Sequence, residues 1–327
     1  MGKLNEFIKT HKALSIILII LLVVLVLGGS TLGYFGWRHA LRASVGIIPN
    51  DEDLANAVRY ERVVIFGVDG AGRFFEETDT PNFDHIFKDG SINYRAYTQF
   101  ESDSAPNWTS MLHGVRYRKH RVHNGDSGVN KFTNDKYPSV FKIYNETYQE
   151  AKHLSIANWG NINFGIIEDL DYITKITTGN DDLIMDKFYE NYLTVDPVIT
   201  FLCFDNVDAA GHSTGQSETY FNAIKEADRK IGELYNFLAT NNKVDKTLFL
   251  CVADHGHKKS GGHGIELPDV YETMIAVNGN LGNIVTGTMG KAVTQDVASI
   301  VLYGLGVKQP EIFDAKVPYN TFKTLNK

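Results

Sequence analysis

Six side chains of this sequence have the residue types and the spacing of a metal-binding site. Asp208 and His212 are four residues apart, so on one helical turn they would face the same way. His255 follows Asp254 directly, and the glycines around His263 would let the backbone fold close to a ligand. Carboxylate and imidazole donors without thiolate favour zinc, and manganese less strongly. The predicted ligands are Asp69, Asp208, His212, Asp254, His255 and His263.

A serine that precedes a proline is a second candidate for chemistry. Segment 104–107 reads Ser-Ala-Pro-Asn, and Pro106 shortly after Ser104 is typical of a helix start. There the serine oxygen would lie beside free amide groups and the positive end of the helix dipole, which stabilise an alkoxide and an incoming phosphate. Taken alone, Ser104 is better explained as a helix cap, and each acid as a cap or turn residue. Beside a metal cluster, Ser104 is the predicted nucleophile.

Three apolar runs would position these groups, because an acidic residue follows each of them. The runs span 63–68, 198–204 and 247–253, and they are followed by Asp69, Asp205 and Asp254. Continuous apolar runs rich in β-branched and aromatic residues are typical of buried parallel strands. Between them, apolar residues recur at helical spacing, most clearly over 218–239. Alternating strands and helices predict an α/β sandwich, in which ligands bind beyond the carboxyl ends of the strands.

The N-terminal segment predicts where the domain is located. No charged residue lies between Lys12 and Arg38, and the run 13–37 would form a helix of about 37 Å at about 1.5 Å per residue. That length spans a bilayer core of about 30 Å. The lysines of segment 1–12 would stay in the cytoplasm by the positive-inside rule, which leaves the rest of the chain outside. We expect a transmembrane signal anchor, a stalk over 38–60 and one catalytic domain over 61–327.

A cleaved signal peptide is the alternative interpretation of the same segment. Small residues near Ser30 resemble a cleavage site, and cleavage there would release a secreted protein. The continuation of the apolar stretch beyond Ser30 favours the anchor. Both interpretations place the catalytic domain outside the cell.

Composition narrows the class of protein further. The 327 residues carry a formal net charge of −7, which disfavours binding to a nucleic-acid duplex. Contents of 43% hydrophobic and 22% charged residues are ordinary for a globular chain. Cys203 and Cys251 lie inside apolar runs and are expected to be buried thiols, although a disulfide between them stays open for an exported protein. The sequence does not indicate an oligomeric state.

The order of the motifs resembles the alkaline phosphatase superfamily, most closely its nucleotide pyrophosphatase/phosphodiesterase branch. The resemblance runs from Glu61 to Gly279. That branch has an aspartate after its first strand, a Ser or Thr before a residue-Pro-Asn step, then Asp-x-x-x-His, Asp-His-Gly and a late His-Gly. The matching segments here are 68–70, 104–107, 208–212, 254–256 and 263–264.

The resemblance implies a three-layer α/β sandwich with a central, mostly parallel sheet flanked by helices. It implies two zinc ions, one held by Asp208, His212 and His263, the other by Asp69, Asp254, His255 and the Ser104 oxygen. Asn124 would bind a phosphoryl oxygen, and Arg121 stands where the branch usually has glycine. The implied reaction is hydrolysis of an anionic phosphoester through a phosphoserine. A diester is favoured, because a counterpart of the arginine of monoesterases is not evident.

Other members of the superfamily provide the alternatives. A sulfatase would need an arginine where Trp108 stands, and it would use a calcium site of oxygen ligands. A phosphoglycerol or phosphoethanolamine transferase usually has several membrane spans. A catalytically inactive surface-binding domain is the non-enzymatic alternative, and the complete set of predicted ligands argues against it.

Overall fold

The computed structural model describes residues 36, 40, 42–131 and 136–325. The chain divides into two compact units, 1–43 and 44–327, and the fold described below is that of the second. The predicted transmembrane segment 13–37 lies, apart from Gly36, outside the described residues. Within the described part of the chain, no helix has the length and apolar character needed to cross a membrane.

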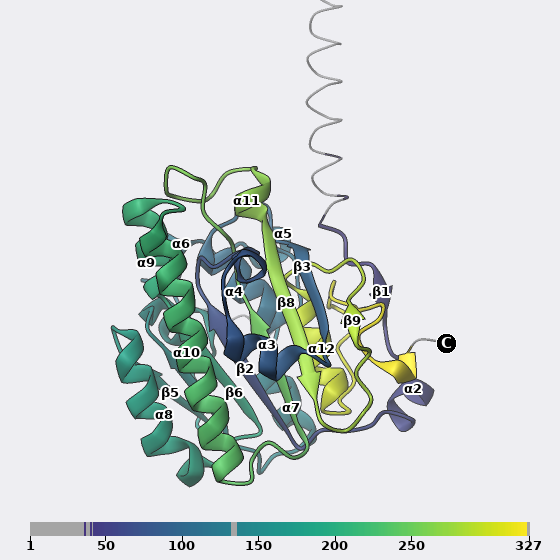
Figure 1. The fold of residues 1–327 in the computed structure, drawn as a ribbon. Helices are drawn as coiled ribbons and strands as arrows, with labels where there is room; N and C mark the ends of the chain where they lie inside the picture. The colour runs from purple at the N-terminus through teal and green to yellow at the C-terminus, as the bar shows by residue number, and fades with distance from the viewer. Residues whose placement is uncertain (1–35, 37–39, 41, 132–135, 326–327) are drawn as a thin grey trace, which may run out of the picture. The chain divides into compact units, whose positions relative to one another are not determined.

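An eight-stranded mixed sheet forms the centre of the second unit (Figure 1). In spatial order its strands are β5 (Ile173–Thr177), β4 (His153–Ala157), β6 (Ile199–Phe204), β2 (Arg62–Val68), β7 (Thr247–Val252), β8 (Glu272–Gly279), β3 (Ser91–Tyr97) and β9 (Gly287–Thr288). Strands β5, β4, β6, β2 and β7 run parallel, and β8 is antiparallel to both of its neighbours. The predicted α/β fold with a mostly parallel sheet is confirmed.

The three acid-terminated runs form adjacent strands at the middle of the sheet. In the parallel registers, Val68 of β2 lies opposite Phe204 of β6, and Gly67 lies opposite Val252 of β7. All three strands therefore end at the same level of one sheet edge. The acids that follow them, Asp69, Asp205 and Asp254, leave the sheet side by side.

Side chains alternate between the two faces of β2, and each face builds its own core. Val64, Phe66 and Val68 pack into one core, beneath α3 (Pro81–Phe87), α8 (Asp181–Val195) and α10 (Glu218–Thr240). Val63 and Ile65 pack into the other, with α4 (Ser104–His113), α7 (Val140–Thr147) and α12 (Asp296–Gly304). The sheet is thus covered on both sides (Figure 1), as its continuously apolar strands require.

Short elements complete the unit and join its edges. They are β1 (Gly46–Ile47), α2 (Asp51–Ala55), η1 (Phe74–Glu77), α5 (Tyr117–His120), α6 (Asn124–Ser127), the π-helical turn η2 (Ile162–Ile166), α9 (Asn206–Thr214), α11 (Pro268–Tyr271), β10 (Val317–Pro318) and η3 (Lys323–Leu325).

The compact unit begins earlier than the expected boundary at residue 61. Strand β1 pairs antiparallel with β10 near the other end of the chain, with Gly46 opposite Pro318. Tyr60 is buried, and its hydroxyl donates to Asn283 Oδ1 at 2.5 Å. Segment 44–60, which we expected to be part of a stalk, is therefore held against the domain. Its partners lie more than two hundred positions away in the sequence, so local composition does not reveal these contacts.

The two cysteines are buried on opposite faces of the sheet. Cys203 of β6 belongs to the core with α4, whereas Cys251 of β7 belongs to the core with α10. Both thiols are free and fully buried. The two cysteines are thus buried thiols, as expected. A disulfide between them is not possible, because the sheet separates their side chains.

Candidate metal centre and nucleophile

Asp254 follows β7 at the acid-lined sheet edge, and only one of its carboxylate oxygens accepts a hydrogen bond from the described residues. Its Oδ1 accepts hydrogen bonds from the backbone N–H groups of Gly70 and His255, both at 2.9 Å. Its Oδ2 is buried and has no hydrogen-bond partner among the described residues. A buried carboxylate oxygen without a donor is costly, so this atom points to a cation.

Asp69 and His255 lie beside Asp254 and form the first group of donors. One ligand atom from each of the three residues lies within 4.8 Å of the others. The indole Nε1 of Trp108 donates to Asp69 Oδ2 at 2.8 Å, which fixes the carboxylate. His255 Nδ1 lies 3.3 Å from Gly256 O, so it carries the proton and Nε2 faces the acids with its lone pair.

Helix α4 brings Ser104 to this first group. The helix begins at Ser104, as the Ser-Ala-Pro-Asn segment predicts, and its N-cap Asp103 has an extended backbone. Ser104 Oγ lies 3.3 Å from Asp69 Oδ1 and 3.2 Å from His255 Nε2. The hydroxyl is buried with the donors, at the positive end of a ten-residue helix.

A second group of donors consists of Asp208, His212 and His263. Asp208 and His212 lie on α9, one turn apart, and Asp208 Oδ2 is 3.4 Å from His212 Nε2. His263 comes from the loop after β7, and its Nε2 lies 3.0 Å from His212 Nε2. Asp103 accepts from His263 Nδ1 at 2.8 Å, which leaves Nε2 as the donor atom. Two imidazole nitrogens facing each other are suited to share a cation.

Asn124 lies beside the nucleophile, at the start of α4. Its Oδ1 accepts the N–H of Ala105 at 2.8 Å, which binds it to the start of α4. Its amide nitrogen is the end that can donate to a phosphoryl oxygen. Arg121 ends α5 with φ 54°, the left-handed conformation that glycine adopts most easily. Arg121 therefore adopts, in the turn that leads to Asn124, the backbone conformation expected of the glycine that it replaces.

His257 belongs to this centre but was missed by the sequence interpretation. It is fully buried, and its Nε2 lies 2.9 Å from Asp208 Oδ1. With Asp208 and His255 it forms a further group whose ligand atoms lie within 4.8 Å. The only signal in the sequence was its alternation with His255 across Gly256.

The electrostatics of the centre favour a bound cation. Burial, and then the charges of Asp254, Asp208 and Asp205, raise the pKa of Asp69 well above its ordinary value. Burial is also the main reason that the pKa of Asp254 rises to about 7. Burial and the neighbouring histidines hold the pKa of His255 well below its ordinary value, so this imidazole is neutral. Carboxylates that repel one another beside a neutral imidazole leave the centre with excess negative charge. Divalent cations would balance that charge.

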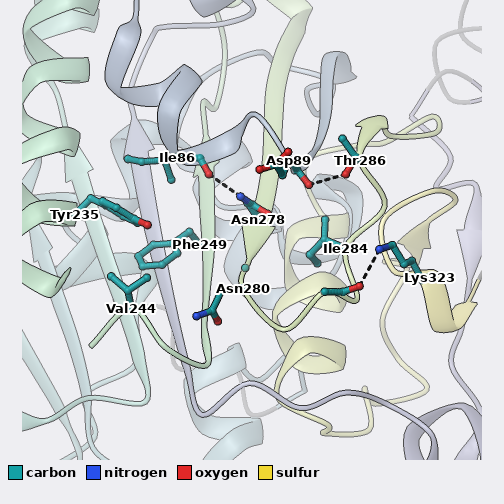
Figure 2. A pocket seen from close by; sticks show the side chains of 12 residues that line it. Ile86, Asp89, Tyr235, Val244, Phe249, Asn278, Asn280, Ile284, Thr286 and Lys323 are labelled. Atoms are coloured by element: carbon teal, nitrogen blue, oxygen red, sulfur yellow. Dashed lines mark hydrogen bonds between the residues drawn. The ribbon is translucent and has the colours of Figure 1, made fainter. Parts of the chain in front are cut away.

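A separate cavity of about 400 Å³ lies near the opposite edge of the sheet (Figure 2). It opens near Phe249 of β7 and Asn278 of β8, which are paired in the sheet. Asn278 donates to Ile86 O at 2.6 Å, and Lys323 donates to Gly282 O at 2.8 Å. Among its described lining residues, Asp89 is the only carboxylate and histidine is absent, so it lacks the donors of a metal site.

Comparison with protein families agrees with the resemblance seen in the motifs. The family described as type I phosphodiesterase / nucleotide pyrophosphatase matches residues 131–297, just over half of the chain. The matched segment contains the second donor group and the Asp254–His255 pair. Asp69 and Ser104 come from the preceding part of the chain, and the fold brings them to the same sheet edge.

Curated relatives share part of the chain. GPI ethanolamine phosphate transferase 1 of Aspergillus fumigatus is 34% identical over 143 residues, which are 39% of this chain and 14% of that protein. The protein of the same name from Chaetomium globosum is 32% identical over 95 residues, or 29% of this chain and 10% of that protein. The chain thus matches only a small part of the length of these relatives.

Solved structures share the fold. Murine ectonucleotide pyrophosphatase/phosphodiesterase 5 superposes with a TM-score of 0.62 at 14% identity, covering 76% of this chain and 96% of that one. An inactive variant of the same protein has been solved in complex with AMP. The lipoteichoic acid synthase LtaP from Listeria monocytogenes superposes with a TM-score of 0.61 at 15% identity, covering 88% and 81%. The alkaline phosphatase-like fold is therefore confirmed.

We predict that Gly70→Ala disrupts the metal centre. Gly70 has φ +72°, and a Cβ there would lie 2.7 Å from Asp208 Cα and 2.9 Å from Asp208 Oδ1. Alanine must therefore displace Asp208, and metal affinity should fall at least about 10-fold. Gly179→Ala is the matched control, because Gly179 has φ +78° and open space around its Cβ position. Titration of both variants with zinc against a chelator measures the difference, and equal affinities would contradict the prediction.

Proposed function

We propose that this chain, which belongs to the type I phosphodiesterase / nucleotide pyrophosphatase family of the alkaline phosphatase superfamily, is a metal-dependent phosphodiesterase with Ser104 as its nucleophile. The observation that carries the proposal is the position of Ser104 Oγ. It lies at a helix N-terminus, 3.2 Å from an imidazole nitrogen and 3.3 Å from a carboxylate oxygen of one donor group.

The donor set fits two zinc ions, as the motifs imply. Asp208, His212 and His263 would hold one ion, and Asp69, Asp254, His255 and Ser104 the other. Three histidines and three carboxylates without thiolate suit zinc, and manganese is the alternative metal. The unpartnered Oδ2 of Asp254 and the facing nitrogens of His212 and His263 support this assignment. When bound, the ions would acidify the serine hydroxyl and neutralise charge on the phosphoryl group.

The residues of the chain then define two displacement steps. Ser104 Oγ loses its proton and forms a bond to phosphorus, while the bond from phosphorus to the leaving alcohol breaks and that oxygen takes up a proton. A water molecule next attacks the phosphoserine, and the bond between phosphorus and Oγ breaks to restore the hydroxyl. Asn124 would orient a phosphoryl oxygen through its amide nitrogen, because its Oδ1 is already held by Ala105.

A second candidate function is transfer of the phosphoryl group to an alcohol. The curated relatives are named GPI ethanolamine phosphate transferase 1, and this favours an acceptor other than water. The first step on Ser104 would be the same in both reactions. Product analysis separates them, because a transferase would form a new diester when glycerol or ethanolamine is added and a hydrolase would form the monoester.

Residues 13–37 are proposed as a membrane anchor that holds the catalytic domain outside the cell. The support is the uncharged apolar run and the lysines that precede it. A membrane-bound enzyme of this kind would meet anionic phosphoesters at the cell surface.

We predict that Ser104→Ala abolishes turnover of bis-para-nitrophenyl phosphate. Removal of the attacking oxygen should lower kcat by at least about 10³-fold, while metal content is largely retained. Thr109→Ala is the matched control, because Thr109 lies on the same helix and its buried hydroxyl has no hydrogen-bond partner among the described residues. Near wild-type turnover by Ser104→Ala would show that the nucleophile is misassigned. Faster cleavage of para-nitrophenyl sulfate or of the monoester by the wild type would contradict a diesterase.

A chain purified without chelator is expected to contain two zinc ions. The two donor groups set this stoichiometry, because each brings three ligand atoms within 4.8 Å. Dialysis against a chelator should abolish activity, and added zinc should restore it. Elemental analysis measures the content. Full activity at a metal content near zero would rule out the proposed chemistry.

The full-length chain should require detergent for release from membranes. A variant that starts at Ser44, where the compact catalytic unit begins, should stay soluble and keep its turnover. Fractionation and N-terminal sequencing measure both properties. A soluble product that starts near Ser30 would identify segment 13–37 as a cleaved signal peptide instead.

A further inference from the structure

We infer that His257 is a positioning residue that orients the Asp208 carboxylate by donating a hydrogen bond from Nε2. The inference rests on the proposed function, because it concerns the ion that Asp208, His212 and His263 would hold. His257 is outside the ligand set that the motifs imply, and its contact with Asp208 assigns it a separate task at the same centre.

The contact is short and completely enclosed. His257 Nε2 lies 2.9 Å from Asp208 Oδ1, and the histidine side chain has no exposed surface. The other carboxylate oxygen, Oδ2, lies 3.4 Å from His212 Nε2. His257 thus engages Oδ1, which also lies 3.8 Å from His263 Nε2, and leaves Oδ2 directed at His212. A carboxylate held in this way offers a single, preoriented ligand atom.

The surroundings of the imidazole decide which of its nitrogens carries the proton. Nδ1 is buried and has no hydrogen-bond partner among the described residues. A proton on Nδ1 would therefore be a buried N–H without an acceptor, which is unfavourable. A proton on Nε2 points instead at Asp208 Oδ1. The neutral ring consequently donates from Nε2, and the same nitrogen has no lone pair for a metal.

The local fold holds the ring in this place. The side-chain Nε2 of Gln216 donates to His257 O at 2.6 Å, which ties the backbone to the end of α9. The ring packs against Gly211 so closely that a Cβ at that glycine would lie 2.3 Å from the ring Cδ2. Gly211 stands between Asp208 and His212 on the same helix. The glycine in this turn therefore makes room for the imidazole that orients the preceding aspartate.

Two substitutions separate the hydrogen bond from the bulk of the ring. In glutamine, Nε2 is as many bonds from the backbone as the Nε2 of histidine, so His257→Gln keeps a donor facing Asp208. His257→Met fills similar space without a donor. We expect the Kd for zinc at the weaker site to rise about 10- to 100-fold in His257→Met and only a few-fold in His257→Gln.

The readouts are chelator competition for zinc, the visible absorption of the cobalt-substituted protein and the Tm of the metal-free protein. The cobalt spectrum of His257→Gln should match that of the wild type, because a positioning residue leaves the ligand set unchanged. Metal-free Tm values that agree between His257→Gln and His257→Met would show that the difference in Kd arises at the metal centre. His212→Ala provides the reference for loss of a true ligand.

Two results would overturn the inference while leaving the proposed function intact. In the first, the wild type binds two metal ions and the His257→Met variant binds zinc with the same Kd as the wild type. The other is a His257→Gln variant that loses metal as His212→Ala does and changes its cobalt spectrum, which would make His257 a ligand. A wild type that binds no metal would instead overturn the proposed function itself.

Discussion

The structure depends on one electrostatic constraint: three adjacent parallel strands end in acids at a single buried edge. Asp69, Asp205 and Asp254 follow β2, β6 and β7, and their charges, together with burial, raise the pKa of Asp69. Water could not neutralise such a cluster at this depth, and burial holds the pKa of His255 well below its ordinary value, so this imidazole supplies no positive charge. A buried cluster of this composition is consistent with a metal site, which links the fold to the chemistry proposed for it.

The side chains around the acids are arranged to hold each donor in one orientation. Trp108 fixes Asp69, Asp103 fixes His263, and His257 fixes Asp208. The contacts on Asp69 and His263 use the atom that faces away from the centre and leave the facing atom available. On Asp208, His257 contacts Oδ1 and leaves Oδ2 directed at His212. Because the holding residues come from other elements than their partners, the ligands are positioned by the packing of the whole domain. Preorganisation of this kind limits the reorganisation needed when charge develops on a phosphoryl group.

Much of this arrangement was predictable from the sequence, because it depends on local patterns. Continuous apolar runs identified β2, β6 and β7 to within a residue or two, and helical periodicity over 218–239 identified α10. The proline two residues after Ser104 marked the start of α4, where the structure begins that helix. The spacing of Asp208 and His212 placed both on one helical face, and α9 has them there. These signals arise from backbone preferences and side-chain periodicity within a few residues.

Only the tertiary structure decided which distant groups meet. The order β6-β2-β7 brings Asp69 next to Asp254, although 185 positions separate them in the chain. The pairing of β1 with β10 includes residues before the expected domain boundary. The contact of His257 with Asp208 depends on the approach of the loop after β7 to helix α9, and a lone histidine after a glycine gives no local sign of it. Such contacts follow from strand order and close packing, which are properties of the assembled chain and not of any one segment.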